Sequence, residues 1–447
     1  MISLALMLNR IAACAVCLTL VTMWAARADD AATGPTVNLS LDQAISLALA
    51  GNLSYRSAVA DEKAARARVL QAGAGRLPAV NAAYTYVHTQ NAASFSIPVP
   101  GPAGVTFQNI QLSAKDVNSV NATLQYGIFS GGAVQAAIGQ AAGGLAAAES
   151  QLAAARNTVV RDTTNAYYQL IQSRRQSTIA GEAVGVAAQN VATAGQLLRA
   201  GSAARADLLK QQLSLANAQV SSIQAGAAAS LANAALANLI DINLGSDIRP
   251  TQALGPTGQT YALAELLARA QSRRPEVAAA QDAVAIAQSA VAGAKAGRLP
   301  AVALSVEEGS TKPNFQNVPQ PQLSESLAAT WRLFDGGLTR GRIEEASAEL
   351  EKAQVNVRQT QNGVDLEVRQ SYLNYVAAGA QVGAAQAAQT SADENLRVSR
   401  VRFGAGVGTS LELSDALLAD TQARTQYVSA LANVRIALAA LQRAAAL

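Results

Sequence analysis

The sequence predicts a mixed fold of two internal repeats, in which long antiparallel helical hairpins are combined with pairs of amphipathic strands. Three observations lead to this fold class. A set of short motifs occurs twice in the same order, and proline is absent from two very long stretches. In addition, the hydrophobic period changes from helical to two at matching places in both halves.

The first 28 residues have the features of a secretory signal peptide. Arg10 supplies the positive charge, a run of apolar and small residues follows, and Ala28 ends a small-x-small cleavage site. We therefore expect an exported chain that begins at Asp29. The initiation residue stays open between Met1 and Met7, because a start at Met7 gives a more regular signal.

Both cysteines, Cys14 and Cys17, lie inside this signal, so the mature chain is expected to lack disulfides and thiolate metal ligands. Residues 11–14 also resemble a lipobox, which would make Cys14 a lipidated N-terminus. Asn9 and Arg10 interrupt the apolar stretch that such a signal needs. Lipidation of Cys14 stays an alternative.

Composition excludes several classes of function. Without the signal, 32 basic residues face 30 acidic ones, so no nucleic-acid footprint is expected. One histidine, His88, and the absence of a pocket-forming carboxylate motif predict a protein that is no enzyme and holds no metal or cofactor. No run of about 18 apolar residues follows the signal, so a membrane crossing would require a closed β-barrel.

The chain repeats itself. Residues 75–80 recur letter for letter as residues 297–302, an offset of 222, whereas the Phe-x-Gly-Gly motif at 129–132 recurs at 334–337, an offset of 205. The domain prediction is a first repeat over 29–249 and a second over 250–447. The change of offset places 17 extra residues in the first repeat, and the proline-rich segment Asn91–Asn118 is predicted to hold them as an irregular loop.

Each repeat is predicted to contain one long helical hairpin, because interior proline is absent and helix-forming residues dominate. Helices of about 65 residues are expected from Gly132 to Arg199 and from Leu338 to Phe403, each about 100 Å long. Shorter return helices are expected over Ala206–Leu239 and Leu411–Arg443. Glycine-rich turns near 201 and 406 separate the helices of each pair, with no lysine to suggest a phosphate loop.

Strand pairs are predicted at 79–129 and 301–334, where apolar and polar residues alternate. Val120 to Ile128 and Leu327 to Leu333 show the alternation, and strands of about ten residues have the length needed to cross a bilayer. Tyr126 and Trp331 are candidates for a lipid-facing aromatic band. Four strands cannot close a membrane barrel, so the strands predict an oligomer.

Short helices are expected before each strand pair, over Leu41–Gln71 and Leu263–Lys295. The full order is a short helix, a strand pair, a long helix, a glycine turn and a return helix, all of which occur twice. A soluble sheet with one buried face would give the same strand alternation. The long helices favour membrane-crossing strands over a soluble sheet, because no globular core buries such helices and they must pack side by side.

In its motifs the chain resembles the TolC family of outer-membrane efflux proteins over nearly all of its mature length. The opening Leu39–Ile45, the doubled Gly-Arg-Leu-Pro, the doubled Phe-x-Gly-Gly and the doubled glycine turn followed by an acid and leucine carry the resemblance. It implies a homotrimer with a twelve-stranded β-barrel in outer-membrane lipid and a twelve-helix α-barrel in the periplasm. It also implies a periplasmic adaptor and an inner-membrane pump of the RND or ABC class as partners.

The resemblance also implies site residues. Glu412 and Asp415 match two acidic rings of a periplasmic gate, and Asp207 matches a tip acid that holds the closed state. The turns around Gly201 and around the second set of tip glycines match adaptor-docking tips; that set comprises Gly404, Gly406 and Gly408. Gly408 and Phe403 replace an arginine and a tyrosine of the family's closing network, so a latch through Arg402 or Arg205 is expected.

The predicted function is the exit channel of a tripartite efflux or type I secretion system, located in the outer membrane. The cargo stays open between drugs, protein and metal ions. The alternative is a structural coiled-coil protein without transport activity, which would explain the helices but not two amphipathic strand pairs.

Overall fold

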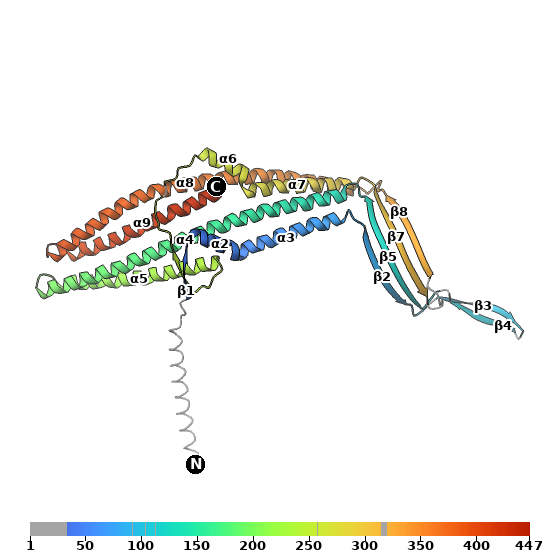
Figure 1. Ribbon diagram of the computed structural model, residues 1–447, viewed down its shortest axis with the longest axis horizontal. Coiled ribbons are helices and arrows are strands. Elements are labelled where there is room, and N and C mark those ends of the chain that lie inside the picture. Colours follow the sequence, from blue (N-terminus) through green and yellow to red (C-terminus); the bar gives the residue numbers. More distant parts are fainter. Residues whose placement is uncertain (1–33, 92, 103, 112, 257, 314–319) are drawn as a thin grey trace, which may run out of the picture. The chain divides into compact units, whose positions relative to one another are not determined.

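The computed structural model describes residues 34–447, apart from 92, 103, 112, 257 and 314–319. The predicted signal peptide, the choice between Met1 and Met7 and the question of Cys14 lie outside the described residues. The chain divides into two compact units. One contains residues 58–153 and 275–363, with the antiparallel strands, and is called the strand-bearing unit. The other contains residues 154–274 and 364–447 together with the N-terminal segment up to Ser57, with the hairpin tips, and is called the tip-bearing unit (Figure 1).

The helices of the two repeats match one another in length. In the first repeat they are α2 (Leu41–Gly51), α3 (Leu53–Ala74), α4 (Ala133–Arg199) and α5 (Arg205–Leu239). In the second repeat they are α6 (Leu263–Arg273), α7 (Pro275–Ala296), α8 (Leu338–Gly404) and α9 (Ser410–Ala444). Corresponding helices have 11, 22, 67 and 35 residues in both repeats. The long helices and their returns confirm the bounds expected from proline and glycine.

Each predicted short helix is in fact two helices, so the single-helix expectation was wrong. In the second repeat Pro275 occupies the first position of α7, and Arg274 before it has an extended backbone with ψ 125°. In the first repeat Asn52 breaks the helix without proline. Its side-chain oxygen accepts hydrogen bonds from the backbone N–H groups of Ser54 at 3.0 Å and Tyr55 at 3.2 Å, which starts α3.

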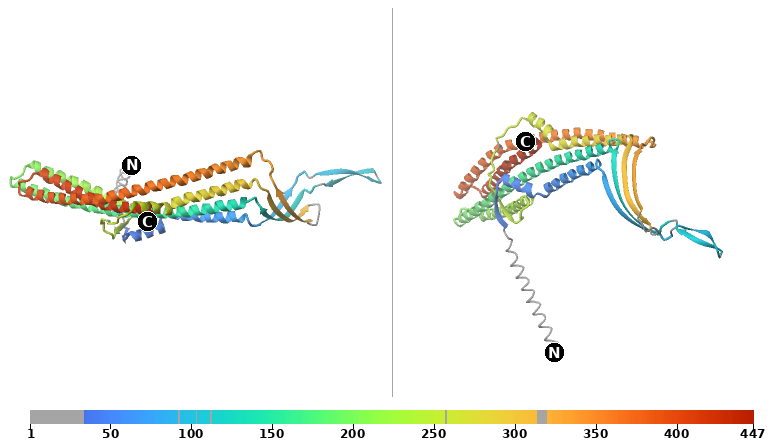
Figure 2. Two further views of the ribbon diagram at one scale, coloured as in Figure 1. Left: turned by 90° about the horizontal axis from the view of Figure 1, so that it is seen from above. Right: turned by 45° about the vertical axis from the view of Figure 1, so that its right-hand side comes forward.

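The strand-bearing unit holds a four-stranded antiparallel sheet in the order β2–β5–β7–β8. Its strands are β2 (Ala79–His88), β5 (Asp116–Phe129), β7 (Ala301–Pro313) and β8 (Gln320–Thr330). Figure 2 shows the sheet curved along its strands. The predicted pairs β2–β5 and β7–β8 are present, and β5 joins them by pairing with β7.

Register gives the sheet one mainly apolar face, which also carries Glu308 and Glu325, and one polar face. Leu124 of β5 lies opposite Val80 of β2 and Val306 of β7, and Leu304 lies opposite Leu327. On the other face Thr123 lies opposite Asn81 and Glu307. Because directly opposed residues share a face, the period of two expected for β5 is confirmed.

Two strand details correct the sequence expectation. Trp331 and Leu333 lie beyond the end of β8, and the Trp331 indole N–H donates a hydrogen bond to the Arg298 carbonyl oxygen at 3.1 Å. The proline-rich insertion is no irregular loop: β3 (Ser94–Gly101) and β4 (Gly104–Gln111) form a separate antiparallel hairpin. Pro98 and Pro100 fit because in a two-stranded ribbon every strand has a free edge.

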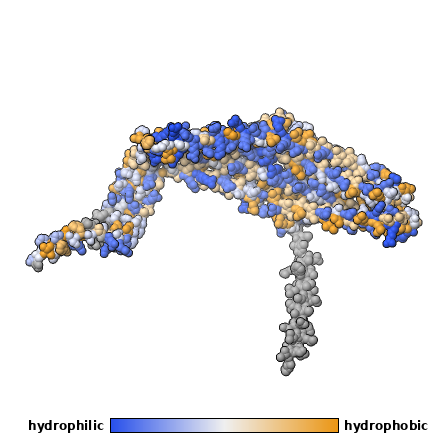
Figure 3. Space-filling model, turned by 180° about the vertical axis from the view of Figure 1, so that it is seen from behind, coloured by the Kyte–Doolittle hydropathy of each residue, from blue (hydrophilic) through white to orange (hydrophobic). Residues whose placement is uncertain are grey.

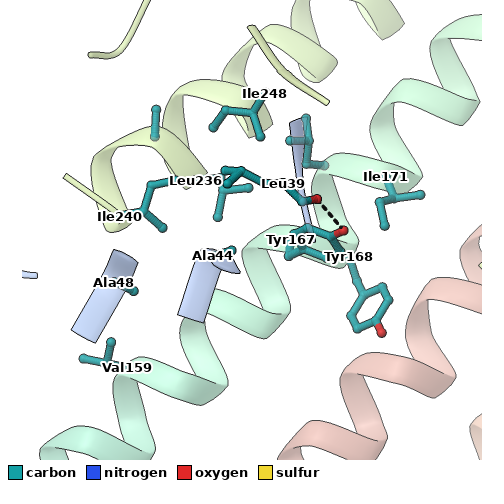
Figure 4. Packing of buried hydrophobic residues seen from close by; sticks show 12 residues of the cluster. Leu39, Ala44, Ala48, Val159, Tyr167, Tyr168, Ile171, Leu236, Ile240 and Ile248 are labelled. Atoms are coloured by element: carbon teal, nitrogen blue, oxygen red, sulfur yellow. Dashed lines mark hydrogen bonds between the residues drawn. The ribbon is translucent and has the colours of Figure 1, made fainter. Parts of the chain in front are cut away.

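The tip-bearing unit contains a core that sequence periodicity did not predict. A parallel pair forms between β1 (Gly34–Leu39) and β6 (Ser246–Pro250), more than 200 residues apart in sequence. Leu39, Tyr167 and Ile248 are buried in this core, and the Tyr167 hydroxyl donates to the Leu39 carbonyl oxygen at 3.0 Å (Figure 4). The buried hydroxyl is thereby satisfied, which fixes the strand pair against α4.

A buried guanidinium ties α6 to the end of α9 in the same unit. The Arg274 side chain is 3% exposed and donates to Glu367 at 2.8 Å and to the Ala444 carbonyl oxygen at 3.0 Å. Glu367 also pairs with Arg443. The carbonyl groups at the C-terminus of a helix lack intrahelical partners, so Arg274 caps α9 as well as pairing with a carboxylate.

One described stretch, Leu263–Ala296, has the length and composition of a membrane-spanning helix, contrary to the sequence expectation of none. The stretch is divided into α6 and α7 at Arg274, and it carries this buried, ion-paired guanidinium near its middle. A break in the helical backbone and a charged side chain are both costly in lipid, so a single span through this stretch is unfavourable. The surface in Figure 3 shows polar and apolar residues interspersed along the helices.

Candidate functional site at the hairpin tips

Both helical hairpins turn through the same backbone motif. Gly201 and Gly406 have φ values of 73° and 75°, a left-handed conformation that favours glycine. The Ser202 N–H donates to the Leu197 carbonyl oxygen at 2.8 Å, and the Val407 N–H donates to the Arg402 carbonyl oxygen at 3.0 Å. These six-to-one hydrogen bonds are those of a Schellman motif, which closes the C-terminus of a long helix.

The three glycines of the second tip have different structural requirements. Gly404 is the last residue of α8, and a Cβ atom there would meet nothing within 4 Å. Gly406 provides the left-handed turn. Gly408 lies so close to the end of α8 that a Cβ atom would come within 2.9 Å of the Phe403 backbone nitrogen. The tip therefore requires glycine at 406 and 408, and at 404 it leaves room for a side chain.

The return helices begin with acids at equivalent positions. Glu412 and Thr409 form a capping box: the Glu412 N–H donates to the Thr409 hydroxyl at 3.1 Å, and the Thr409 N–H donates to the Glu412 carboxylate at 3.4 Å. In the first hairpin Asp207 accepts the Ala204 N–H at 3.2 Å. Both acids therefore have local roles at helix starts, where the helix dipole favours negative charge.

Polar contacts join the two hairpins directly behind the tips. The Ser410 hydroxyl at the start of α9 donates to the Asp207 carboxylate of α5 at 2.5 Å. The Gln211 amide donates to the Ser410 carbonyl oxygen at 2.9 Å and to the Ser414 hydroxyl at 3.1 Å. Gln211 is fully buried and Ser410 is 2% exposed, so the hydrogen bond between them is shielded from water, whereas Asp207 is partly exposed. We call Asp207, Gln211, Ser410 and Ser414 the tip latch.

Sequence analysis identified Asp207 but missed the other three residues of the tip latch. A sequence signal for Gln211 exists: Leu208, Gln211, Leu215 and Ala218 follow steps of three and four, so Gln211 is a polar residue in the apolar seam of α5. Leu208, Leu215 and Ala218 do pack against the apolar core behind the tips. A lone polar residue in such a seam is a candidate for a specific partner.

The two acids predicted to line a gate lie on one exposed stripe of α9. Glu412 and Asp415 are both exposed, one helical turn apart, whereas Leu413, Ala416 and Leu417 between and beside them are buried. Arg402 lies 3.8 Å from the Glu412 carboxylate, across the tip turn. Asp207 contacts Ser410 and neither of these two acids. Whether Glu412 and Asp415 form rings in an assembly stays a prediction.

Asp415 also borders a groove of about 340 Å³ between α5 and α9. Leu213, Leu411 and Leu418 line it, with Lys210 opposite on α5, and the three leucines are more than half exposed. Uncharged polar side chains of α5 and α9 also line the groove, and Lys210 and Asp415 add one charge of each sign. A groove with this lining is suited to contact with another amphipathic helix.

Electrostatics distinguish two aspartates of this unit. The Ser410 hydroxyl, followed by the Ala204 N–H, lowers the pKa of the Asp207 carboxyl below its ordinary value of 3.8. Burial raises the pKa of Asp420, which is 4% exposed and has one carboxylate oxygen without a hydrogen-bond partner. Asp393 and Glu182 raise that pKa further and Arg424 opposes them. Within the described residues no cluster of three or more metal-ligating side chains occurs.

Paired helical hairpins about 100 Å long, together with an amphipathic sheet whose strands have bilayer-crossing length, define a membrane channel protein of mixed class. The chain belongs to the outer membrane efflux protein family, whose pattern it matches over residues 44–241 and 266–447. It is an outer-membrane exit channel of an efflux or type I secretion system, and proteins of this family are channels rather than enzymes.

Known relatives agree with this assignment. Protein CyaE of Bordetella pertussis is 30% identical over 337 residues, which cover 73% of this chain and 70% of the relative. A membrane protein from Pseudomonas aeruginosa shares the fold with a TM-score of 0.77 at 23% identity, covering 91% of this chain and 93% of its own. The Campylobacter jejuni CmeC outer membrane channel has a TM-score of 0.77 at 16% identity, with 91% and 85% covered.

Proposed function

We propose that three copies of this chain close one continuous duct, with twelve strands in outer-membrane lipid and twelve helices in the periplasm. The sheet supports the proposal. Its outer strands are β2 and β8, and neither has a second neighbour within the described residues. The four strands alternate in direction, so the first, β2, and the last, β8, run in opposite directions. Strand β8 of one copy can therefore pair with β2 of the next copy in the antiparallel manner of membrane barrels.

The exposed apolar face of the sheet supports the same assembly. Val80, Tyr84, Val120, Leu323 and Leu327 are each more than half exposed in the single chain. An open sheet with such a face and two free edges is prone to aggregate in water. Closure of the sheet in lipid covers the apolar face and removes both edges.

The tip latch is the basis of our proposal for a gate at the periplasmic end of the duct. Hydrogen bonds join the two hairpins directly behind both turns, beside the apolar cluster that also packs them together, so separation of the hairpins at the tips has to break these hydrogen bonds. We propose that Asp207, with Ser410 and Gln211, holds the closed state. Glu412 and Asp415, three copies of each, then line the constriction and favour cations, as charged rings do in other pores.

The proposal includes partners. The tip turns at Gly201 and Gly404–Gly408 expose Gly201, Ala405 and Val407, which gives an adaptor hairpin small and apolar surface to dock on. The apolar groove beside Asp415 extends that surface. The adaptor would connect the duct to an inner-membrane pump of the RND or ABC class, and the pump and adaptor, rather than this chain, would select the cargo.

Single-channel conductance of the purified protein in planar bilayers tests the gate. We expect low-conductance, cation-selective openings in the wild type, and weaker cation selectivity in Glu412→Ala and Asp415→Ala. Glu351→Ala removes the same charge from an exposed position far from the tip in α8 and should leave selectivity unchanged. Selectivity equal in all variants would reject the acidic gate while keeping the pore, and absence of conductance from a folded trimer would reject the duct.

A further inference from the structure

A basic pocket lies at the end of α9, in the tip-bearing unit but away from the tips. Its volume is about 460 Å³, and four arginines line it: Arg156 and Arg161 of α4, Arg273 at the end of α6, and Arg443 in the last turn of α9. Of the pocket lining that the structure describes, no residue is an aspartate or glutamate. Arginine stays protonated in proteins, so deprotonation cannot relieve this charge.

Two of the four arginines have partners outside the pocket. Arg161 pairs with Asp162 at 2.7 Å, and Arg443 pairs with Glu367. Arg156 and Arg273 are exposed and form no ion pair with any residue that the structure describes. Their guanidinium groups come from different elements and border the same cavity, which leaves two forks of donors available to a ligand.

The rest of the lining fits an anion with some apolar surface. Asn157, Thr164 and Gln442 add neutral polar groups, whereas Ile45, Val160 and Ala439 form an apolar part of the wall. Leu447 lines the pocket as well, and its N–H donates to the Gln442 carbonyl oxygen at 2.9 Å.

We propose that this pocket is a binding site for an oxyanion, a phosphate or carboxylate group, held by the forks of Arg156 and Arg273. A planar guanidinium can donate two parallel hydrogen bonds to such a group, and the partly enclosed site strengthens them relative to water. The site is distinct from the tip latch, with which it shares no residue. It gives the channel a point at which an anionic molecule stabilises the junction of α4, α6 and α9.

The test uses the full-length protein in detergent at low ionic strength, with inorganic phosphate as the first probe. Titration calorimetry and thermal unfolding measure binding and the resulting rise in Tm. We expect the double variant Arg156→Gln/Arg273→Gln to bind phosphate about tenfold more weakly or worse, because two charge-assisted donors are lost. Arg358→Gln/Arg369→Gln removes two exposed arginines of α8 and should bind like the wild type.

Further arms identify the source of the oxyanion and guard against a folding defect. In separate experiments phosphate is replaced by vesicles of anionic phospholipid, with zwitterionic vesicles as the comparison, and by a carboxylate-bearing peptide. The probe whose binding depends most strongly on the two arginines identifies the source of the oxyanion. Arg156→Lys/Arg273→Lys keeps the charge but removes the forks, so intermediate affinity is expected. Equal binding by wild type and the glutamine variant would overturn the proposal. A second result would also overturn the proposal: the wild type binds no anion, and the glutamine variant forms a less stable trimer. In that case the arginines would contact another part of the assembly rather than a ligand.

Discussion

The hydrogen bond between Ser410 and Asp207 gives the most direct test of the tip latch. Ser410→Ala removes the hydroxyl but leaves the backbone carbonyl that accepts from Gln211 at 2.9 Å. A hydrogen bond to a charged group contributes about 1.5–3 kcal/mol. Asp207 is partly exposed and recovers water when the bond is lost, so we expect about 1–1.5 kcal/mol, or a five- to tenfold shift toward separated tips in each chain.

The assay is a double-mutant cycle on the open fraction in planar bilayers, with Ser410→Ala, Asp207→Asn and the combination. Each single change should raise the open fraction, and the second change should add little to the first. Ser347→Ala, whose hydroxyl is bonded within α8, serves as the control. Additive effects of the two changes, or an open fraction unchanged in all three variants, would refute the latch.

The latch also has a defined pH dependence. The Ser410 hydroxyl lowers the pKa of Asp207 in the latched state, so the latched state favours the ionised carboxyl. Its contribution is complete above the ordinary pKa of 3.8 and is lost as the pH falls through the lowered pKa. The open fraction of the wild type should therefore rise at strongly acidic pH, and this rise should be absent in Asp207→Asn.

Three further predictions concern stability. Gly406→Ala should destabilise the hairpin by about 1–2 kcal/mol, because residue 406 has a left-handed backbone. Gly404→Ala should be neutral or stabilising, because residue 404 is helical and has free space around it. Equal changes in Tm for the two variants would contradict the turn assignment. Arg274→Met should lower the free energy of unfolding by about 3–5 kcal/mol, because Glu367 and the end of α9 lose their buried partner. Thermal unfolding measures this change, and a decrease below about 1 kcal/mol would show that Arg443 alone is enough to pair with Glu367. Asp420→Asn should raise Tm at neutral pH, because burial raises the pKa of Asp420 and disfavours its ionised form in the folded protein. The rise in Tm over the wild type should become smaller as the pH falls toward 3.8. A rise in Tm that does not depend on pH would show that ionisation of Asp420 is not its cause.

The long helices could be predicted from sequence because their limits depend on local chemistry. Helices α4 and α8 begin and end within one residue of the positions expected from glycine, and proline is absent between those positions. Because the motifs are duplicated, each end could be predicted independently in both repeats. The paired strands follow for a similar reason, since a period of two is visible in β5 without knowledge of its partners.

Non-local features could not be read in this way. The pairing of β1 with β6 and the contact of Gln211 with Ser410 join residues about 200 positions apart, and no local pattern encodes the partner. The break at Asn52 was missed because a side-chain cap replaces proline as the signal. The β3–β4 hairpin was missed because proline usually argues against strands, an argument that fails for a two-stranded ribbon.

The order of the four-stranded sheet has a genetic consequence. In the proposed trimer each chain supplies four adjacent strands, β2, β5, β7 and β8, and a chain that lacks β8 leaves a gap that the other two chains cannot seal. One defective copy then disables the two sound copies assembled with it. When half of the chains in a cell are defective and mix at random, roughly one duct in eight is intact. An allele with an internal deletion of β8 should thus be dominant-negative when it is expressed beside the wild-type gene.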